Sequence, residues 1–362
     1  MKFRSLFLSA LCALTVVAGF TSCNDNDEIP AWKEGATVEL PQYRAFILSE
    51  GSMNANNSHL FFINPETDEP YQTDIFEAQN GIKLGDTAND IITENGDIYV
   101  LMNVSEVLYR LNGSGVIQAI YNGFEADQLG QPRSMVEEDG KIYVTCYGGY
   151  VARFDAKTLK YEAKVQTDAN PEEIVEHDGI LYCVNSGYGL GHTMSIIDTK
   201  KFDKAESAEI PSNPFGLKED DGHIYIMAYN ADYTTSVYTF DTKTKKYDKI
   251  ADASRMLPVK DKLYLGNTVN KGSWVSPDYE TTFSVYDTNT RKTAAWNLTN
   301  VPEALKKNTV YMIERNPYDG SFYIATADYV SNSPVYHFTA DGNFKSTFNA
   351  GGINANAMVF LR

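Results

Sequence analysis

A unit of about forty residues recurs along this chain, and this repeat constrains the fold more than any other feature. Its clearest copy runs from Asn170 to Glu209, where two short apolar runs meet at Asp178-Gly179 and two further strand-length runs follow. Asp-Gly between apolar runs is the strongest short-range signal for a β-hairpin. Each unit therefore predicts a four-stranded antiparallel sheet.

A tyrosine that follows the hairpin turn gives the period of the repeat. It occurs at Tyr99, Tyr143, Tyr182, Tyr225, Tyr264 and Tyr323, so the spacings are 44, 39, 43, 39 and 59 residues. The preceding turns are Asn95-Gly96, Asp139-Gly140, Asp178-Gly179, Asp221-Gly222, Lys260-Asp261 and Asp319-Gly320. A four-stranded unit with this period is typical of a β-propeller blade, whereas a helical solenoid would need a 3.6-residue apolar period that these units lack.

The two ends of the chain supply the pieces of a seventh blade. Three strands are expected at Tyr43 to Leu48, His59 to Ile63 and Pro70 to Phe76, but none precedes them, while Ala357 to Leu361 is a strand with no partner after it. Joining the fragments would close the ring and remove two exposed sheet edges. The sequence therefore predicts an all-β, seven-bladed β-propeller over residues 43–362.

The residues before the propeller read as export and attachment signals. Lys2 and Arg4 precede an apolar centre in a segment, residues 1–22, that resembles a bacterial lipoprotein signal peptide, with Cys23 as the lipidated residue. Residues 23–42 are acidic and poor in apolar side chains, which predicts a tether. This pattern is similar to that of lipoproteins displayed outside the outer membrane, so we expect an outer-membrane, lipid-anchored protein that faces the cell exterior, with the periplasm as the alternative.

Charge and cysteine content exclude some functions. Removal of residues 1–22 would take two of the 31 basic and none of the 48 acidic residues, leaving a formal charge of −19. Nucleic acid is then disfavoured, because its binding relies on neutralising phosphates. Cys146 and Cys183 fit no zinc motif, and we expect them to be small core residues without a disulfide.

Aromatic and amide side chains concentrate in the loops between second and third strands, which share one face of a propeller with the loops that enter each blade. The aromatic residues of these loops are Tyr147, Tyr188, Tyr229, Tyr233, Trp274, Tyr279 and Tyr329. Such a surface suits large, polar-decorated ligands. The opposite face carries tight turns, which we expect to be too short to form a pocket.

The predicted ligand-binding residues come from this face. They are Trp274, Tyr279, Tyr188, Tyr233, Asn185, Asn230, Arg133 and Arg255. The two arginines lie near the channel mouth, and either ligand contact or ion pairing between blades would explain them. Two long segments, Asn267 to Thr282 and Leu298 to Asn308, are expected to form a raised wall, the second with one helical turn capped by a side chain and its reciprocal Glu303.

Motifs for catalysis are sparse. Gly187-Tyr188-Gly189-Leu190-Gly191 has the spacing of a dinucleotide site but joins two strands, so it reads as a loop. The five histidines are scattered, and none pairs with another at metal-ligand spacing. We therefore expect no enzyme, with no catalytic residue, no metal site and no cofactor.

Three segments resemble known families. Ile142 to Cys146 followed by Val151 to Leu159, and Leu181 to Asn185 followed by Ser195 to Thr199, resemble the YVTN-type propeller repeat of bacterial surface and periplasmic proteins. Phe46 to Gly51 followed by Asn56 to Ser58 is similar to the opening of lipoprotein propellers encoded beside TonB-dependent outer-membrane receptors. The best-known members of that group capture cobalamin and related corrinoids and pass them to the receptor.

Three functions follow as hypotheses. The first is a surface lipoprotein that captures a ligand, a corrinoid as the best guess, for a TonB-dependent receptor, with membrane contact through the lipid only. The second is a glycan- or protein-binding module, and the third an enzyme that resembles the propeller lactonases, with Glu172, Glu173, Arg133 and His192 as its residues. Fold alone does not decide among them. Asp86-Thr87-Ala88 also resembles a bacterial O-glycosylation acceptor, with an unmodified turn as the alternative.

Overall fold

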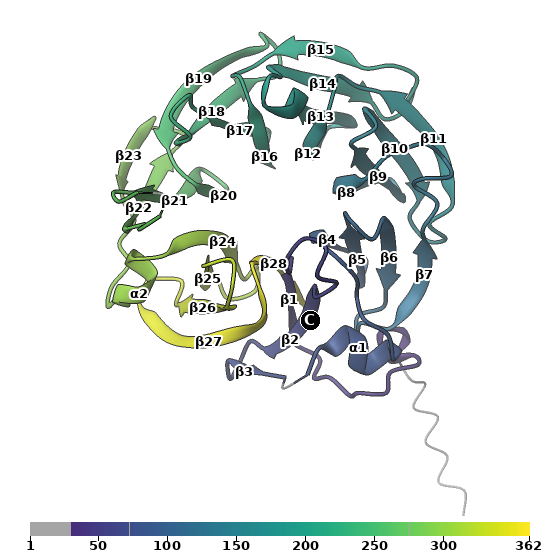
Figure 1. The fold of residues 1–362 in the computed structure, drawn as a ribbon, viewed down its shortest axis with the longest axis horizontal. Coiled ribbons are helices and arrows are strands. Elements are labelled where there is room, and N and C mark those ends of the chain that lie inside the picture. The colour runs from purple at the N-terminus through teal and green to yellow at the C-terminus, as the bar shows by residue number, and fades with distance from the viewer. Residues whose placement is uncertain (1–29, 72, 274) are drawn as a thin grey trace, which may run out of the picture.

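The chain forms a closed ring of seven four-stranded antiparallel sheets around a central axis (Figure 1). The computed structural model describes residues 30–71, 73–273 and 275–362. In every blade the first strand lies next to the axis and the fourth at the rim. The repeat therefore predicted the architecture and the number of blades correctly.

The strands follow the chain around the ring. Blades 1 to 3 contain β4 (Ala88–Glu94), β5 (Asp97–Met102), β6 (Val107–Leu111) and β7 (Ile117–Tyr121); β8 (Pro132–Glu138), β9 (Lys141–Cys146), β10 (Tyr150–Asp155) and β11 (Tyr161–Gln166); and β12 (Pro171–His177), β13 (Ile180–Asn185), β14 (Thr193–Asp198) and β15 (Glu206–Glu209). Blades 4 to 6 contain β16 (Pro214–Asp220), β17 (His223–Tyr229), β18 (Thr235–Asp241) and β19 (Lys246–Asp252); β20 (Arg255–Val259), β21 (Lys262–Asn270), β22 (Tyr279–Asp287) and β23 (Lys292–Ala295); and β24 (Thr309–Arg315), β25 (Phe322–Ala327), β26 (Asn332–Phe338) and β27 (Phe344–Ile353).

Blade 7 joins the two ends of the chain, as the missing strands predicted. Its order is β28 (Ala355–Leu361), β1 (Arg44–Ser49), β2 (His59–Asn64) and β3 (Glu69–Pro70). The last strand pairs antiparallel with the first over Arg44↔Leu361 to Ser49↔Ala355. Figure 1 shows the two strands side by side at the point where the ring closes.

The hydrophobic core is divided among the seven interfaces between blades. Each of seven clusters of buried side chains combines residues from two neighbouring blades. The repeated tyrosine contributes to this packing, because Tyr99 of blade 1 donates a hydrogen bond to the carbonyl of Ala156 in a turn of blade 2, at 3.2 Å. Cys146 and Cys183 are both free and buried in such clusters, as expected.

The hairpin turns follow the sequence, with one exception. At Asn95-Gly96 both residues have positive φ, 51° and 84°, as a two-residue turn of this hand requires. At Asp319-Gly320 the expected tight turn is absent. Instead β24 and β25 pair only as far as Arg315↔Phe322, because Asn316, Asp319 and Ser321 form a network of side chain to backbone hydrogen bonds within a longer connection.

The expected strand from Pro70 to Phe76 is present in blade 7 only as the short β3, and its extension to Phe76 was wrong. Only Glu69–Pro70 pairs with β2, and the chain then enters helix α1 (Ile75–Asn80). The carboxylate of Asp74 accepts hydrogen bonds from the backbone N–H groups of Phe76 and Glu77, and Gly81 ends the helix at a φ of 68°. An N-cap and a left-handed C-cap therefore override the apolar alternation that suggested a strand.

Part of the predicted tether is packed on the propeller. A short 3-10 helix, η1 (Ala31–Lys33), places Trp32 under the guanidinium of Arg44, 3.7 Å from the ring centroid. The carbonyl of Glu34 accepts a hydrogen bond from Asn112, and Leu40 is buried. We call residues 30–43 the strap, because they bind the propeller at the turn that links β6 to β7.

The long segments of blades 5 and 6 also differ from expectation in part. Strands β21 and β22 pair out to Asn270↔Tyr279, so most of the expected loop from Asn267 to Thr282 is an extended hairpin. The helical turn is present as α2 (Glu303–Lys306), but it begins after Pro302 with no side-chain cap. None of the helices in the described ranges reaches the length and apolarity of a membrane span.

Candidate functional site

The propeller has two different faces. The loop face carries the connections from second to third strands and the entries to each blade, and the turn face carries the short hairpin turns and the strap. Six of the seven innermost strands have a register shift near their loop-face end. Such bulges are common next to functional sites, because they redirect side chains.

The residues at these shifts form a ring around the mouth of the axis. They are Asn89, Arg133 and Ser134, Glu172 and Glu173, Phe215, Tyr311 and Asn356. Three of these innermost strands begin with a proline. In each of them, the residue directly after the proline is one of those at the mouth of the axis. Sequence reasoning had placed the residues after these prolines at the blade entries, but it missed Tyr311, which no proline precedes.

Arg133, one of the predicted binding residues, forms an ion pair between blades 2 and 3. Its Nε lies 2.9 Å from Oε2 of Glu172, which also accepts a hydrogen bond from the hydroxyl of Tyr147 at 3.1 Å. The other carboxylate oxygen accepts from Asn170 and Ser186, each at 2.9 Å. Burial opposes the charge, but the neighbouring Tyr147 and Glu172 raise the pKa of the Arg133 guanidinium. Its charge is therefore neutralised within the fold.

Arg255 has a different environment at the mouth of blades 5 and 6. Its Nε donates to the carbonyl of Tyr311 and its Nη1 to the carbonyl of Ser254, each at 2.7 Å. The guanidinium lies 4.7 Å from the ring centroid of Tyr311. Among the described residues no carboxylate forms an ion pair with it, so its charge is not neutralised by a partner.

Tyr311 and Tyr329 lie near this arginine, and Phe215, Tyr229 and Tyr279 stand at the loop-face ends of strands in blades 4 and 5. We call these five side chains the aromatic cluster. Phe215 and Tyr229 have ring centroids 4.4 Å apart, and Tyr311 and Tyr329 meet edge to face at 5.8 Å. Burial raises the pKa of Tyr329, with Arg255 acting against it and Tyr279 and Tyr229 adding to it. Blades 4 to 6 thus present ring faces beside a cation.

Glu50 borders the aromatic cluster from blade 7. Its Oε2 lies 2.5 Å from the hydroxyl of Tyr311, and burial together with Glu50 raises the pKa of that phenol. The loop that follows Glu50 is held by Asp86, whose carboxylate accepts from the backbone N–H groups of Asn54 and Asn56. The segment that carries the family resemblance is therefore built into the wall of the mouth.

Three exposed tyrosines of the loop face have left-handed backbone conformations. Tyr188, Tyr233 and Tyr329 have φ values of 58°, 64° and 64°, and their exposed fractions are 76%, 75% and 53%. Bulky residues seldom adopt this conformation, and strain of this kind gathers at functional sites. The fold thus holds three phenol rings outward at a conformational cost.

The remaining predicted residues lie in different settings. Asn185 is buried, and its amide binds Thr193 and Ser195, so it holds its own loop in place. The amide of Asn230 binds Thr234 and Ser236 in the same manner. Trp274 and the predicted lipidation residue Cys23 lie outside the described residues.

Four charged side chains meet along the axis below the mouth. Lys218 lies 3.6 Å from Oε2 of Glu173 and is 48% exposed, so water reaches it inside the ring. The carboxylate of Asp90 accepts from the backbone of Met135 at 2.8 Å. Burial raises the pKa of Glu314 to about 7, which Lys218 partly offsets. These groups link neighbouring blades and leave a polar lining.

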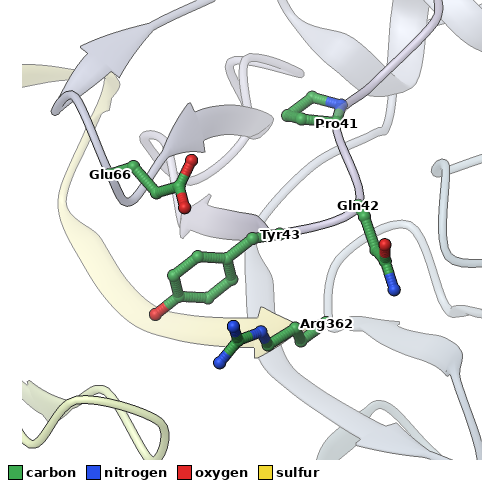
Figure 2. A pocket seen from close by; sticks show the side chains of 5 residues that line it. All are labelled: Pro41, Gln42, Tyr43, Glu66 and Arg362. Atoms are coloured by element: carbon green, nitrogen blue, oxygen red, sulfur yellow. The ribbon is translucent and has the colours of Figure 1, made fainter.

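The turn face has hollows that the sequence did not predict. One, of about 320 Å³, is lined by Pro41, Gln42, Tyr43, Glu66 and Arg362 (Figure 2). The guanidinium of Arg362 lies over the ring of Tyr43 at 5.7 Å. The strap and the last strand provide walls of this open hollow, so it is not formed by the tight turns alone.

Thr87 does not offer a glycosylation acceptor in the folded chain. Its side chain is buried, and its hydroxyl donates to Asp86 at 2.8 Å. The candidate lactonase residues are not arranged as one site. Glu173 accepts a hydrogen bond from the backbone N–H of Leu217, and His192 is exposed on a different loop. Within the described ranges no group of His, Cys, Asp or Glu side chains could hold a metal ion.

Comparison with known proteins supports the propeller class. No protein-family model matches this chain, and no curated protein is significantly similar to it. A putative 6-phosphogluconolactonase from Bacteroides fragilis NCTC 9343 aligns with a TM-score of 0.59 at 12% identity, over 92% of this chain and 100% of that one. The computationally designed Ika8 protein aligns with a TM-score of 0.53 at 9% identity, over 88% and 90%. At these identities both likenesses concern the fold alone.

Proposed function

We propose that this propeller is the ligand-capturing domain of a surface lipoprotein, and that it acts by binding without catalysis. The observation that carries the proposal is the aromatic cluster around Arg255, together with the outward tyrosines of neighbouring loops. Tyrosine and tryptophan give large contact areas at low entropic cost, and rings of this kind dominate binding energies. The loop face is the surface where such contacts concentrate.

A corrinoid is the first candidate for the ligand. It is broad, flat on two sides and fringed with amides, so it requires ring faces for stacking and polar groups at the edges. The resemblance of Phe46 to Gly51 and Asn56 to Ser58 to corrinoid-capturing lipoproteins supports the same ligand, with delivery to a TonB-dependent outer-membrane receptor. A glycan is the second candidate, because exposed tyrosines beside amides also suit sugar rings.

The state of the charged residues favours binding over catalysis. The B. fragilis neighbour carries a lactonase name, and the matching residues proposed for this chain are Arg133, Glu172, Glu173 and His192. Glu172 has accepted four hydrogen bonds, one of them from Arg133, so neither group is free to act as a base or to hold an oxyanion. An assay of lactone hydrolysis should therefore give only the background rate.

Calorimetry with cyanocobalamin and with a glycan panel tests the proposal. The mature chain should bind the corrinoid, and Tyr329→Ala and Tyr229→Ala should each weaken binding about thirtyfold with little change in melting temperature. Tyr233→Ala tests an exposed ring of the same face, and Trp274→Ala tests the tryptophan that the sequence alone predicted as a binding residue. His223→Ala on the turn face is the control, and saturable binding of a glycan alone would replace the corrinoid with the second candidate.

Attachment to the membrane requires a separate test. We propose that Cys23 is lipidated and that its acyl chains hold the protein at the outer membrane. Cys23→Ala should abolish labelling with palmitate and release the protein from the membrane fraction. Unchanged fractionation of this variant would mean that something other than Cys23 anchors the chain.

A further inference from the structure

We propose that the loop face seats an anionic group of its ligand, a phosphate or a carboxylate, on Arg255. This inference rests on the proposed function, because it names a chemical group of the molecule that the aromatic cluster binds. Arginine is suited to two-oxygen anions, since its planar N–H groups match their oxygens in pairs. The question is whether the N–H groups of Arg255 are available for such a contact.

The hydrogen bonds of Arg255 leave one edge of the guanidinium open. Nε and one N–H of Nη1 are used by the carbonyls of Tyr311 and Ser254. Nη2 makes no hydrogen bond within the described residues and is not among the polar atoms shut off from solvent. The two bonds therefore fix the orientation of the guanidinium, while Nη2 keeps its N–H groups for the oxygens of a ligand.

The charges around Arg255 differ from those around Arg133. Arg133 lies against Glu172, whereas Glu50, which borders the aromatic cluster, is held at the hydroxyl of Tyr311 and forms no ion pair with Arg255 within the described part of the chain. In a chain with a formal charge of −17, a cation without a carboxylate partner at the mouth is a local exception. Such a cation offsets the general repulsion of an anionic ligand at this one place.

The rings around Arg255 indicate what the anion is attached to. Tyr311 lies against the guanidinium, Tyr329 meets the ring of Tyr311 edge to face, and Phe215 pairs with Tyr229 on the neighbouring blade 4. An anion bound to Arg255 would therefore lie beside ring faces. The ligand class that fits is a flat, largely apolar or conjugated body that carries one phosphate or carboxylate at its rim.

Matched corrinoids test this assignment. Cobinamide and cobinamide phosphate differ by one phosphate, and the wild-type chain should bind the phosphate form about 10- to 100-fold more tightly, as expected for a charge-assisted contact. Arg255→Met should abolish that preference and Arg255→Lys should retain part of it. Arg133→Met is the control and should leave the preference intact. Because the readout is a ratio between two ligands, a general loss of stability does not imitate it.

A second set of probes separates this inference from the corrinoid proposal. Fluorescence titration with 1-naphthyl phosphate, 1-naphthoate and 1-naphthol compares phosphate, carboxylate and neutral forms of one ring. Preference for an anionic form that is lost in Arg255→Met supports the anion seat even if neither corrinoid binds, and shows which anion is favoured. Equal binding of charged and neutral forms in both probe sets, no binding in either, or a preference that survives Arg255→Met, overturns it.

Discussion

Three tyrosines of the loop face have backbone conformations that tyrosine seldom adopts, and this strain can be measured. Tyr233 has a φ of 64° and is 75% exposed, so its side chain has little packing to lose. Glycine carries no such penalty at positive φ, whereas alanine does. Tyr233→Gly should therefore exceed Tyr233→Ala in free energy of unfolding by about 1 kcal/mol, in urea titrations. At a position with negative φ, the alanine variant is the more stable of the two. A more stable Tyr233→Ala variant here would mean that the backbone at this position is unstrained.

The buried carboxyl of Glu314 predicts a dependence of stability on pH. Burial raises its pKa from 4.5 to about 7, so between these values the folded chain binds more protons than the unfolded chain, and this group destabilises the fold as the pH rises. Glu314→Gln should raise the free energy of unfolding at pH 8 on the order of 1 kcal/mol, and less at pH 4.5. The control is Glu303→Gln on the exposed helix α2, and equal effects of Glu314→Gln at both pH values would contradict the shift.

Some site residues were accessible to sequence reasoning and others were not. Tyr188, Tyr233 and Tyr279 were expected because loop aromatic residues stand out between strands. Tyr311 was not, because the direction of a side chain on an innermost strand depends on the bulge, and a shift of one residue reverses the face. Pairing partners across blades, such as Glu172 with Arg133, depend on the closed ring.

At the scale of elements, local turn chemistry was the most reliable guide. Asn95-Gly96 predicted a hairpin because only a few residues accept positive φ at both turn positions, and the structure has this turn. The segment after β3 failed for a comparable local reason. Asp74 caps α1, but the sequence of Ile75 and Phe76 fits a strand as well as a helix. Which of the two forms is decided by packing against blade 1.

The contact between β26 and the turn after β2 closes the ring through side chains as well as through β-pairing. Asp68 of blade 7 lies 2.8 Å from Nδ1 of His337 in blade 6 and accepts from Ser346 at 2.6 Å. Burial would raise the pKa of Asp68, but the hydrogen bonds from His337, Ser346 and Lys345 outweigh it and hold the pKa below its ordinary value. This carboxylate therefore contributes stability above its unfolded pKa of about 4, and the contribution is lost as the pH falls through the folded value.

Asp68→Asn tests this contact. The variant should lose about 3 kcal/mol of unfolding free energy at pH 7, because it leaves buried partners of the carboxylate unmatched. The difference from the parent should shrink as the pH falls below about 4, where Asp68 is protonated first in the unfolded chain and, at lower pH, in the folded chain as well. Asp341→Asn, in an exposed turn of blade 6, is the matched control. A constant difference across this pH range would show that the ionised form of Asp68 is not what stabilises the closure.

For the molecule as a whole, the strap relates the position of the anchor to the two faces. Trp32, Glu34 and Leu40 bind the turn face beside the β6–β7 turn, on the side opposite the aromatic cluster. Six residues lie between Cys23 and Pro30, so the two can be at most about 25 Å apart. If Cys23 is lipidated as proposed, the turn face is held near the bilayer and the loop face points away from it.

Fluorescence quenching in vesicles tests this orientation with the lipidated protein. A fluorophore on Asp139→Cys, at a turn, should be quenched by lipids that carry a headgroup quencher, whereas one on Tyr233→Cys should be protected. The strap causes the difference in quenching between the two labels. Because it is packed on the turn face, the chain leaves the propeller toward Cys23 from that face in a fixed direction. Trp32→Ala combined with Gln79→Ala removes the cation–π contact and the hydrogen bonds to Thr37 and Val38, so the two labels should then be quenched more equally. Stronger quenching of the loop-face label in the parent would contradict this orientation. The aromatic cluster would then face the membrane, and a membrane-embedded receptor could contact it directly.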